Sequence, residues 1–183
     1  MNCVKCNTKN CRKNIACSAQ KFDSELVLQE YHTPENQEII QAAAKLVDNG
    51  KAGTLSRFDE IVQFAHEMHF EKIGLAYCYG MEAKVAVIFD KLKTAGLNPV
   101  AVSCTTGAMS QCIVNKESTI KSVSCNPISQ AKQLNLETID FAITIGLCLG
   151  HDLLFQKYIK APFTTFVVKD RVFANNPLEI VNQ

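Results

Sequence analysis

Nine cysteines are present among the 183 residues, and eight of them form two groups that could bind metal. Thiolates are soft ligands that select zinc, copper(I) and iron–sulfur clusters. One group lies within the first 17 residues, while the other is spread along the chain where apolar runs end or helix-like runs begin. The first group is Cys3, Cys6, Cys11 and Cys17, and the second is Cys78, Cys104, Cys125 and Cys148.

The N-terminal group has the spacing Cys-x2-Cys-x4-Cys-x5-Cys. Two cysteines separated by two residues can bind one metal ion or one edge of a cluster. Zinc fingers and ribbons usually place a longer segment between their ligand pairs, so this compact spacing favours an iron–sulfur cluster. Zinc is the alternative at this site, and redox-active or incidental thiols are a third interpretation.

Three cysteines of the second group, Cys78, Cys104 and Cys148, each end a predicted strand. In an open parallel sheet the carboxyl ends of the strands lie at one edge, where ligands bind. Cys125 starts the sequence Cys-Asn-Pro-Ile, and Pro127 suits the first turn of a helix, whose N-terminus stabilises a thiolate. One cysteine in such a place is more often a small buried hydrophobic residue, but four of them predict a metal or cluster site.

Two pairs that include histidine accompany these cysteines. His151 and Asp152 follow Cys148 at the start of a predicted helix, so His151 could donate a proton or bind metal, with Asp152 orienting it. Alternatively, Asp152 caps the helix and His151 is a surface residue. His66 and His69 are three residues apart on another predicted helix, and without further ligands we interpret them as surface residues.

Polar residues near the other strand ends are candidates for anion binding. Lys169, Asp170 and Arg171 follow the last predicted strand, and Lys169 and Arg171 could hold an anionic substrate or a charged cluster. A salt-bridged strand end is the other interpretation. Asn126 could donate a hydrogen bond to a sulfur or a substrate, or it could satisfy a turn. Cys112 has no comparable setting, and we treat it as structural or incidental.

The elements that must position these residues follow from hydrophobic periodicity. Strands alternating with helices predict a three-layer, Rossmann-like α/β domain at 21–183 with a small, mostly parallel sheet. Residues 1–20 are too polar to pack a core, so they are predicted to form a metal knuckle. Helices are expected at 24–32, 34–48, 56–69, 80–95, 127–136 and 151–159, and strands at 72–78, 98–104, 140–148 and 163–169, with a short strand near 119–124.

Composition narrows the function classes. The net charge of +1 and the charged fraction of 20% give no basic field for nucleic acid. No run of about 18 apolar residues predicts a membrane span, and the polar start lacks the apolar stretch of a signal peptide. We therefore expect a cytoplasmic protein, whose reduced thiols and odd cysteine count favour metal ligation over disulfides.

Four motifs carry a family resemblance: AYCYG (76–80), CNPISQA (125–131), GLCLGHD (146–152) and VKDRVFANNP (168–177). With them, nearly the whole chain resembles a cysteine-rich prokaryotic family of unknown function whose members are described as metal-binding proteins. The resemblance implies metal binding but no particular activity. The family pattern often has Cys-Cys-Lys where this chain has Ser103-Cys104-Thr105, so a lysine-dependent step there is in doubt; the interval between Cys11 and Cys17 is also shorter than in relatives.

The leading hypothesis is an iron–sulfur protein with one or two clusters, of the [4Fe-4S] type, in redox or small-molecule sulfur or reductive chemistry. Two clusters would relay electrons from a partner protein to the inner site, whereas three inner ligands would leave one iron open to a small-molecule substrate. One alternative is a zinc-binding interaction protein with a structural four-cysteine site and no catalysis. Another is a thiol enzyme with Cys148 or Cys125 as nucleophile and His151 as base.

Overall fold

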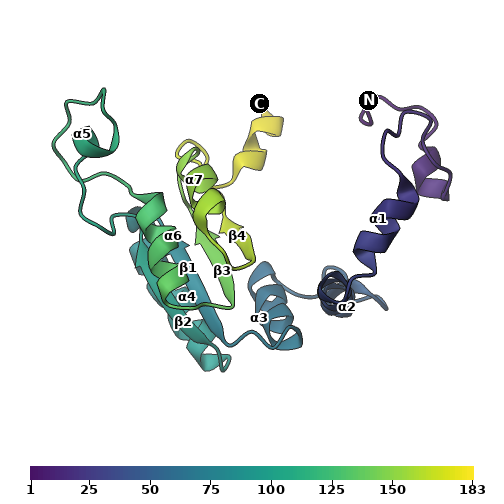
Figure 1. Ribbon diagram of the computed structural model, residues 1–183, viewed down its shortest axis with the longest axis horizontal. Coiled ribbons are helices and arrows are strands. Elements are labelled where there is room, and N and C mark those ends of the chain that lie inside the picture. The colour runs from purple at the N-terminus through teal and green to yellow at the C-terminus, as the bar shows by residue number, and fades with distance from the viewer. The chain divides into compact units, whose positions relative to one another are not determined.

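A computed structural model describes residues 1–183, and in it the apolar runs of the sequence form a four-stranded, all-parallel sheet (Figure 1). The strands β1 and β3 are buried along most of their length, as strands covered on both faces must be. The predicted α/β class with a small parallel sheet is confirmed. The strands are β1 (Lys72–Tyr77), β2 (Asn98–Ser103), β3 (Phe141–Ile145) and β4 (Phe163–Val167), in the order β2-β1-β3-β4.

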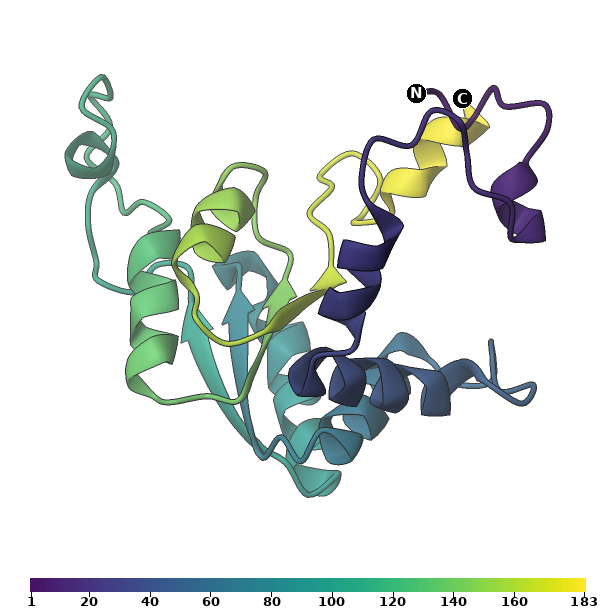
Figure 2. The same cartoon turned by 45° about the vertical axis from the view of Figure 1, so that its right-hand side comes forward.

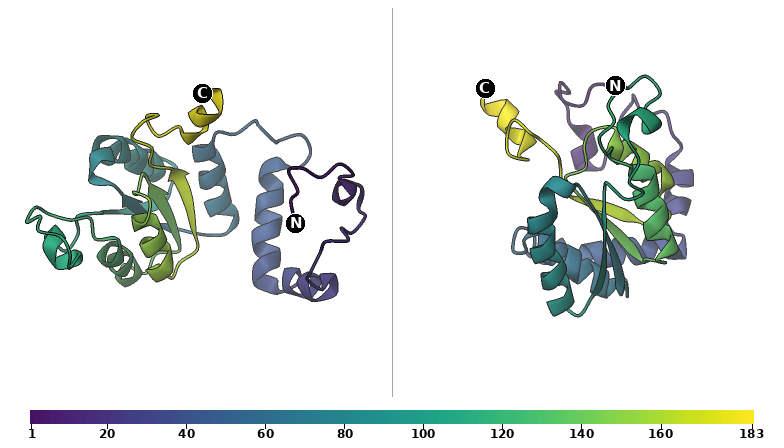
Figure 3. Two further views of the ribbon diagram at one scale, coloured as in Figure 1. Left: turned by 90° about the horizontal axis from the view of Figure 1, so that it is seen from above. Right: turned by 90° about the vertical axis from the view of Figure 1, so that its left-hand side faces the viewer.

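This strand order puts helices on both faces of the sheet. Helix α4 (Glu82–Thr94) connects β1 to β2, whereas α6 (Pro127–Leu136) and α7 (His151–Tyr158) serve connections that run across the sheet in the opposite direction. Because such crossovers are right-handed, opposite directions require opposite faces. Figure 2 shows α6 and α7 on the near face, and the right-hand view of Figure 3 shows α4 opposite α6. The direction changes between β1 and β3, where doubly wound sheets bind ligands.

Helix α3 (Arg57–Glu67) precedes β1 in the chain and covers the same face of the sheet as α4. The Ser56 hydroxyl accepts a hydrogen bond from the Asp59 N–H at 3.2 Å and so caps the start of this helix. Its Phe64 lies 6.1 Å from Phe141 of β3, ring centre to ring centre, and Phe70 stacks on Phe141 at 5.6 Å. These aromatic contacts join α3 and the residues after it to the start of β3.

The opposite face admits α6 at close range because Gly74 has no side chain. A Cβ atom at Gly74 would lie 2.4 Å from Cδ1 of Ile139 and 3.1 Å from Cδ2 of Leu134, which is fully buried. Helix α6 therefore packs directly on Gly74 and Ala76 of β1. This packing brings the N-terminus of α6 to the carboxyl edge of the sheet.

Two parts of this α/β unit differ from the sequence prediction. The expected strand near 119–124 is absent: a single antiparallel bridge joins Ser110 to Val123, beyond the short helix α5 (Gln111–Val114). Strand β3 ends at Ile145 instead of residue 148, because Gly146 takes a φ of +63° and turns the chain. The unit also contains the 3-10 helices η2 (Tyr79–Met81) and η3 (Pro177–Asn182).

The chain divides into two compact units, residues 1–43 and residues 44–183. The first contains η1 (Asn10–Lys13), α1 (Ser24–Tyr31) and the start of α2 (Pro34–Val47). Asp23 caps α1 by accepting a hydrogen bond from the Glu25 N–H at 2.9 Å. No residue of 1–20 is buried, so this segment has no core of its own. None of the helices has the length and hydropathy that crossing a membrane requires.

The tight packing at Gly74 yields a stability prediction. Replacing Gly74 by Val should lower the free energy of unfolding by about 1–3 kcal/mol, because the added methyl groups overlap Ile139 and Leu134. Gly80→Ala is the matched control: neither glycine has a positive φ, and a Cβ at Gly80 meets nothing closer than 3.9 Å. Urea unfolding followed by circular dichroism measures both, and equal stability of the two variants would contradict the packing described.

Candidate functional site

A hollow at the carboxyl edge of the sheet brings together all four cysteines of the predicted inner group. It has no room for a water molecule, so a ligand that contacts all four cysteines must widen it. Its walls come from the ends of β1 and β2, from the first turns of α6 and α7, and from the segment after β3. The lining residues are Cys78, Cys104, Cys125, Pro127, Gln130, Leu147, Cys148 and His151.

Backbone hydrogen bonds fix three of these cysteines. The N–H of Cys78 donates to the carbonyl of Ile145 at 3.1 Å, and the N–H of Cys104 donates to the carbonyl of Tyr77 at 2.8 Å. Both cysteines thus continue the ladder of the sheet by one residue. The residue after Cys125 donates its N–H to the carbonyl of Cys104 at 2.6 Å, which places Cys125 beside the end of β2.

The sulfur atoms have polar neighbours that suit metal ligation. Sγ of Cys104 lies 3.6 Å from Sγ of Cys125. Two thiolates bound to one tetrahedral zinc ion at about 2.3 Å would lie about 3.8 Å apart, so this pair already has the separation that one ion requires. The N–H of Tyr79 donates to Sγ of Cys104 at 3.4 Å, and Nη2 of Arg171 donates to Sγ of Cys148 at 3.0 Å.

The environment of Cys104 keeps its thiol protonated. Burial raises the pKa of Cys104 to about 12, and the neighbouring thiols of Cys125 and Cys78 act in the same direction, while the Tyr79 N–H opposes the shift. A metal ion that binds Cys104 must therefore displace a proton, so its affinity increases with pH.

Gln130 is the residue of this site that the sequence analysis missed. It is fully buried, and its Nε2 donates to the carbonyl of Tyr77 at 3.1 Å and to the carbonyl of Val102 at 2.6 Å. Its Oε1 is a buried side-chain atom with no hydrogen-bond partner. Such an unsatisfied acceptor costs about 1–3 kcal/mol. Gln130 lies in the motif CNPISQA (125–131), but its residue type alone predicts no role at the site.

The segment after β4 carries the predicted anion-binding residues. Nζ of Lys169 lies over Gly146, where a Cβ atom would be 3.6 Å away, and Arg171 contacts Cys148. Neither cation forms a salt bridge. Oδ1 of Asp170 accepts hydrogen bonds from the N–H groups of Val172 and Phe173, both at 2.8 Å. The cations at this edge therefore have no direct counter-ion.

Two of the remaining inner candidates, Asp152 and Asn126, accept hydrogen bonds from nearby backbone N–H groups. Oδ1 of Asp152 accepts hydrogen bonds from the N–H groups of Gly150, at 2.9 Å, and Leu153, at 2.8 Å, so this carboxylate stabilises the first turn of α7. Oδ1 of Asn126 accepts from the N–H of Ser129 at 3.1 Å and caps α6. His151 lines the hollow, and no hydrogen bond engages its ring.

The N-terminal cysteines are arranged differently. Cys3, Cys11 and Cys17 are exposed and Cys6 is half-buried, and these sulfur atoms do not converge on one point.

Nowhere in the chain, the inner hollow included, do three cysteine, histidine or carboxylate side chains lie close enough to share one ion. Hydrogen bonds from the segment after Cys6, first from the N–H of Lys9, lower the pKa of Cys6. N–H groups directed at a sulfur are a common support for a metal thiolate.

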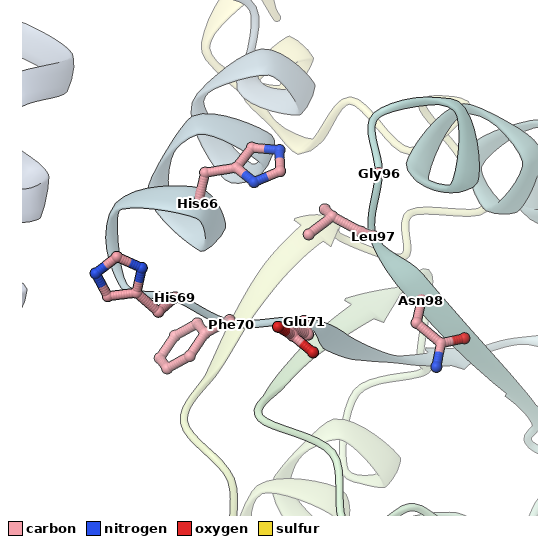
Figure 4. Close-up of a pocket in the computed structure, with 7 residues that line it drawn as sticks. All are labelled: His66, His69, Phe70, Glu71, Gly96, Leu97 and Asn98. Atoms are coloured by element: carbon pink, nitrogen blue, oxygen red, sulfur yellow. The ribbon is translucent and has the colours of Figure 1, made fainter.

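A second cleft, of about 440 Å³, lies at the opposite end of β1 between α3 and the start of β2. Figure 4 shows the ring of His66 directed toward the Gly96 segment and the ring of His69 directed away from it. Nε2 of His66 lies 3.0 Å from the carbonyl oxygen of Ala95. The two histidines therefore do not form a joint metal site, and this larger cleft lacks the nucleophiles and thiols of the cysteine hollow.

Comparison with known proteins gives a family but no activity. Residues 15–166 match the model of a family described as "Protein of unknown function (DUF1847)". An uncharacterized protein of Methanocaldococcus jannaschii is 37% identical over 181 residues, which cover 96% of this chain and 91% of the relative. No solved structure matches the chain.

The buried position of Cys104 predicts slow alkylation in the reduced, metal-free chain. At about pH 8, a pKa near 12 leaves about a thousandfold less thiolate than an ordinary thiol with a pKa of about 8.5. Iodoacetamide should therefore modify exposed Cys17 long before Cys104, and the Cys104 rate should keep rising with pH beyond about pH 9. Peptide mass spectrometry at timed intervals measures both rates. Urea-unfolded chain is the control, and similar rates at the two sites in the folded chain would contradict this burial.

Proposed function

Since the chain belongs to this family of proteins of unknown function, we propose its function from its own site: it binds metal through Cys78, Cys104, Cys125 and Cys148, as an iron–sulfur protein. One observation carries the proposal. Four cysteines that are distant in the sequence line one hollow at the ligand-binding edge of a parallel sheet. Packing alone does not require thiols at all four positions, because other small apolar side chains would fill the same space.

The surroundings of the sulfur atoms support a charged metal–thiolate centre. Four thiolates exceed the charge of a divalent metal ion, so the centre would carry negative charge that its surroundings must stabilise. The Tyr79 N–H and the Arg171 guanidinium already donate to two of the sulfur atoms, and Lys169 lies at the same edge without a carboxylate partner. Hydrogen bonds to sulfur and nearby cations are means by which proteins set the potential of an iron–sulfur cluster.

A second metal site in the N-terminal segment completes the proposal. Cys3, Cys6, Cys11 and Cys17 would gather around one ion or cluster and give residues 1–20 the order that their polar side chains cannot supply. The N–H groups that follow Cys6 favour its thiolate and would begin this site. Two such centres in one chain suit electron transfer from a partner protein to a small molecule bound at the inner site.

A zinc-binding protein without catalysis is the second candidate. It is favoured by the distance of 3.6 Å between the sulfur atoms of Cys104 and Cys125, which suits two ligands of one ion. In a four-iron cluster each thiolate binds a different iron atom, so these two sulfur atoms would have to separate, whereas a two-iron cluster places two thiolates on each iron.

Metal analysis after purification without oxygen distinguishes the two candidates. We expect a brown protein with about two to eight iron atoms and an equal amount of acid-labile sulfide per chain. Visible absorption, iron and zinc assays and sulfide determination measure this. A colourless protein with zinc alone would select the second candidate, and a chain that retains neither metal would contradict the proposal.

Serine variants locate the inner centre. Replacing Cys78, Cys104, Cys125 or Cys148 singly by Ser should remove most of the metal bound in the 44–183 unit, because a hydroxyl is a poor ligand for these soft metals. Cys112→Ser is the matched control, since Cys112 lies outside the hollow with its sulfur 3.3 Å from the Ser110 hydroxyl. Metal content should be measured in a background with Ser at Cys3, Cys6, Cys11 and Cys17, and an undiminished metal content in all four inner variants would refute the assignment.

A further inference from the structure

Gln130 joins the three elements that carry three of the inner cysteines. It lies one turn into α6, the helix that Cys125 precedes. Its amide nitrogen donates to the carbonyls of Tyr77 and Val102, which lie directly before Cys78 and two residues before Cys104. Because both donor positions of the nitrogen are used in this way, the orientation of the amide group is fixed, with the nitrogen toward the strand ends.

The oxygen of the same amide is left without a donor. Gln130 is fully buried, and Oε1 has no hydrogen-bond partner although Gln130 lines the hollow with the cysteines. Thiolates bound to a metal carry no proton and cannot supply this bond. A buried acceptor of this kind can receive a hydrogen bond from the donor of a ligand that widens the hollow.

The charges at the same edge indicate the sign of that ligand. Lys169 and Arg171 have no carboxylate partner, and the carboxylates of Asp152 and Asp170 accept hydrogen bonds from backbone N–H groups. The ring of His151, on the wall of the hollow, has no hydrogen-bond partner. A small anion would therefore meet two cations that have no carboxylate partner.

We infer that the inner site, once its metal widens the hollow, binds a small monoanion that carries one hydrogen-bond donor, which Gln130 Oε1 accepts. Gln130 is thus a specificity residue, and Lys169 and Arg171 attract the anion to the edge. This inference rests on the proposed metal site and requires that one metal position accepts the anion in addition to the cysteine ligands. A closed structural site, with every metal position taken by protein ligands, would have no use for this acceptor.

Two anions of equal charge and similar size test the inference: hydrosulfide, which has an S–H donor, and bromide, which has none. Both are titrated anaerobically into the metal-loaded full chain as sodium salts, by calorimetry and visible absorption. Wild type should prefer hydrosulfide, and Gln130→Met should reduce the ratio of the two affinities by about tenfold, as expected for one lost hydrogen bond. Gln133→Met is the matched control, because Gln133 lies on α6 and donates to Glu137 instead.

The ratio of the hydrosulfide affinity to the bromide affinity shows whether Gln130 recognises the anion or only supports the fold. If Gln130 only ties the strand ends together, Gln130→Met weakens both anions equally, and the inference is wrong. Lys169→Met should weaken both anions and reduce the salt dependence of binding, whereas Lys160→Met should not. Iron and zinc are assayed in the same samples. If the wild-type protein binds neither metal, both the proposed function and this inference are wrong. If the metal-loaded wild type does not bind hydrosulfide at millimolar concentration, only this inference is wrong. That wild-type titration decides the matter if Gln130→Met does not fold.

Discussion

The parallel pairing of β1 with β2 on one side and β3 on the other determines where every residue of the inner site lies. The N–H groups of Cys78 and Cys104 extend this pairing by one residue beyond the strands, toward the carbonyls of Ile145 and Tyr77. A slip of one residue would turn the side chains of the shifted strand to the other face of the sheet. Gln130 opposes such a slip, because one amide group bonds to the ends of both β1 and β2.

The same constraint creates a competition between protons and metal. The sheet edge buries Cys104 next to two other thiols, so its neutral form is favoured and its pKa rises to about 12. The Tyr79 N–H donates to Sγ of Cys104 and opposes this rise in pKa, and the Arg171 guanidinium donates to Sγ of Cys148. The fold therefore holds Cys104 as a protonated thiol in a position that suits a thiolate, and a metal that binds Cys104 releases its proton.

Much of this arrangement could be predicted because it depends on strong local patterns. Apolar runs located all four strands, and their alternation with helices gave the parallel order that brings Cys78, Cys104 and Cys148 to one edge. The end of β3 was placed too late, since the apolar run continues past Gly146 while its positive φ turns the backbone. The expected strand near 119–124 is reduced to one bridge, because its polar sequence gives it no partner in the sheet.

The roles of individual polar residues were harder to predict, because hydrogen bonds depend on tertiary geometry. Asp152 and Asn126 have types and positions that suit either capping or chemistry, and the backbone N–H groups from which they accept are set by the folded structure. Gln130 belongs to the motif CNPISQA, but its role could not be predicted because its partners are carbonyls 28 and 53 residues earlier in the chain. The N-terminal cysteines pose the opposite case: their spacing is a local pattern, but their sulfur atoms are not brought together by any packing of residues 1–20.

The excursion between Cys104 and Cys125 has a practical consequence for protein engineering. Its two ends are joined by the hydrogen bond from the N–H of Asn126 to the carbonyl of Cys104, and its two arms pair with each other through the N–H of Ser124 and the carbonyl of Met109. Beyond that pairing, the tip at residues 115–117 is exposed. Exposed tips of this kind tolerate inserted domains. A fluorescent reporter placed there would leave the four inner cysteines in position, while lying close enough in sequence to Cys125 to report on the state of the site.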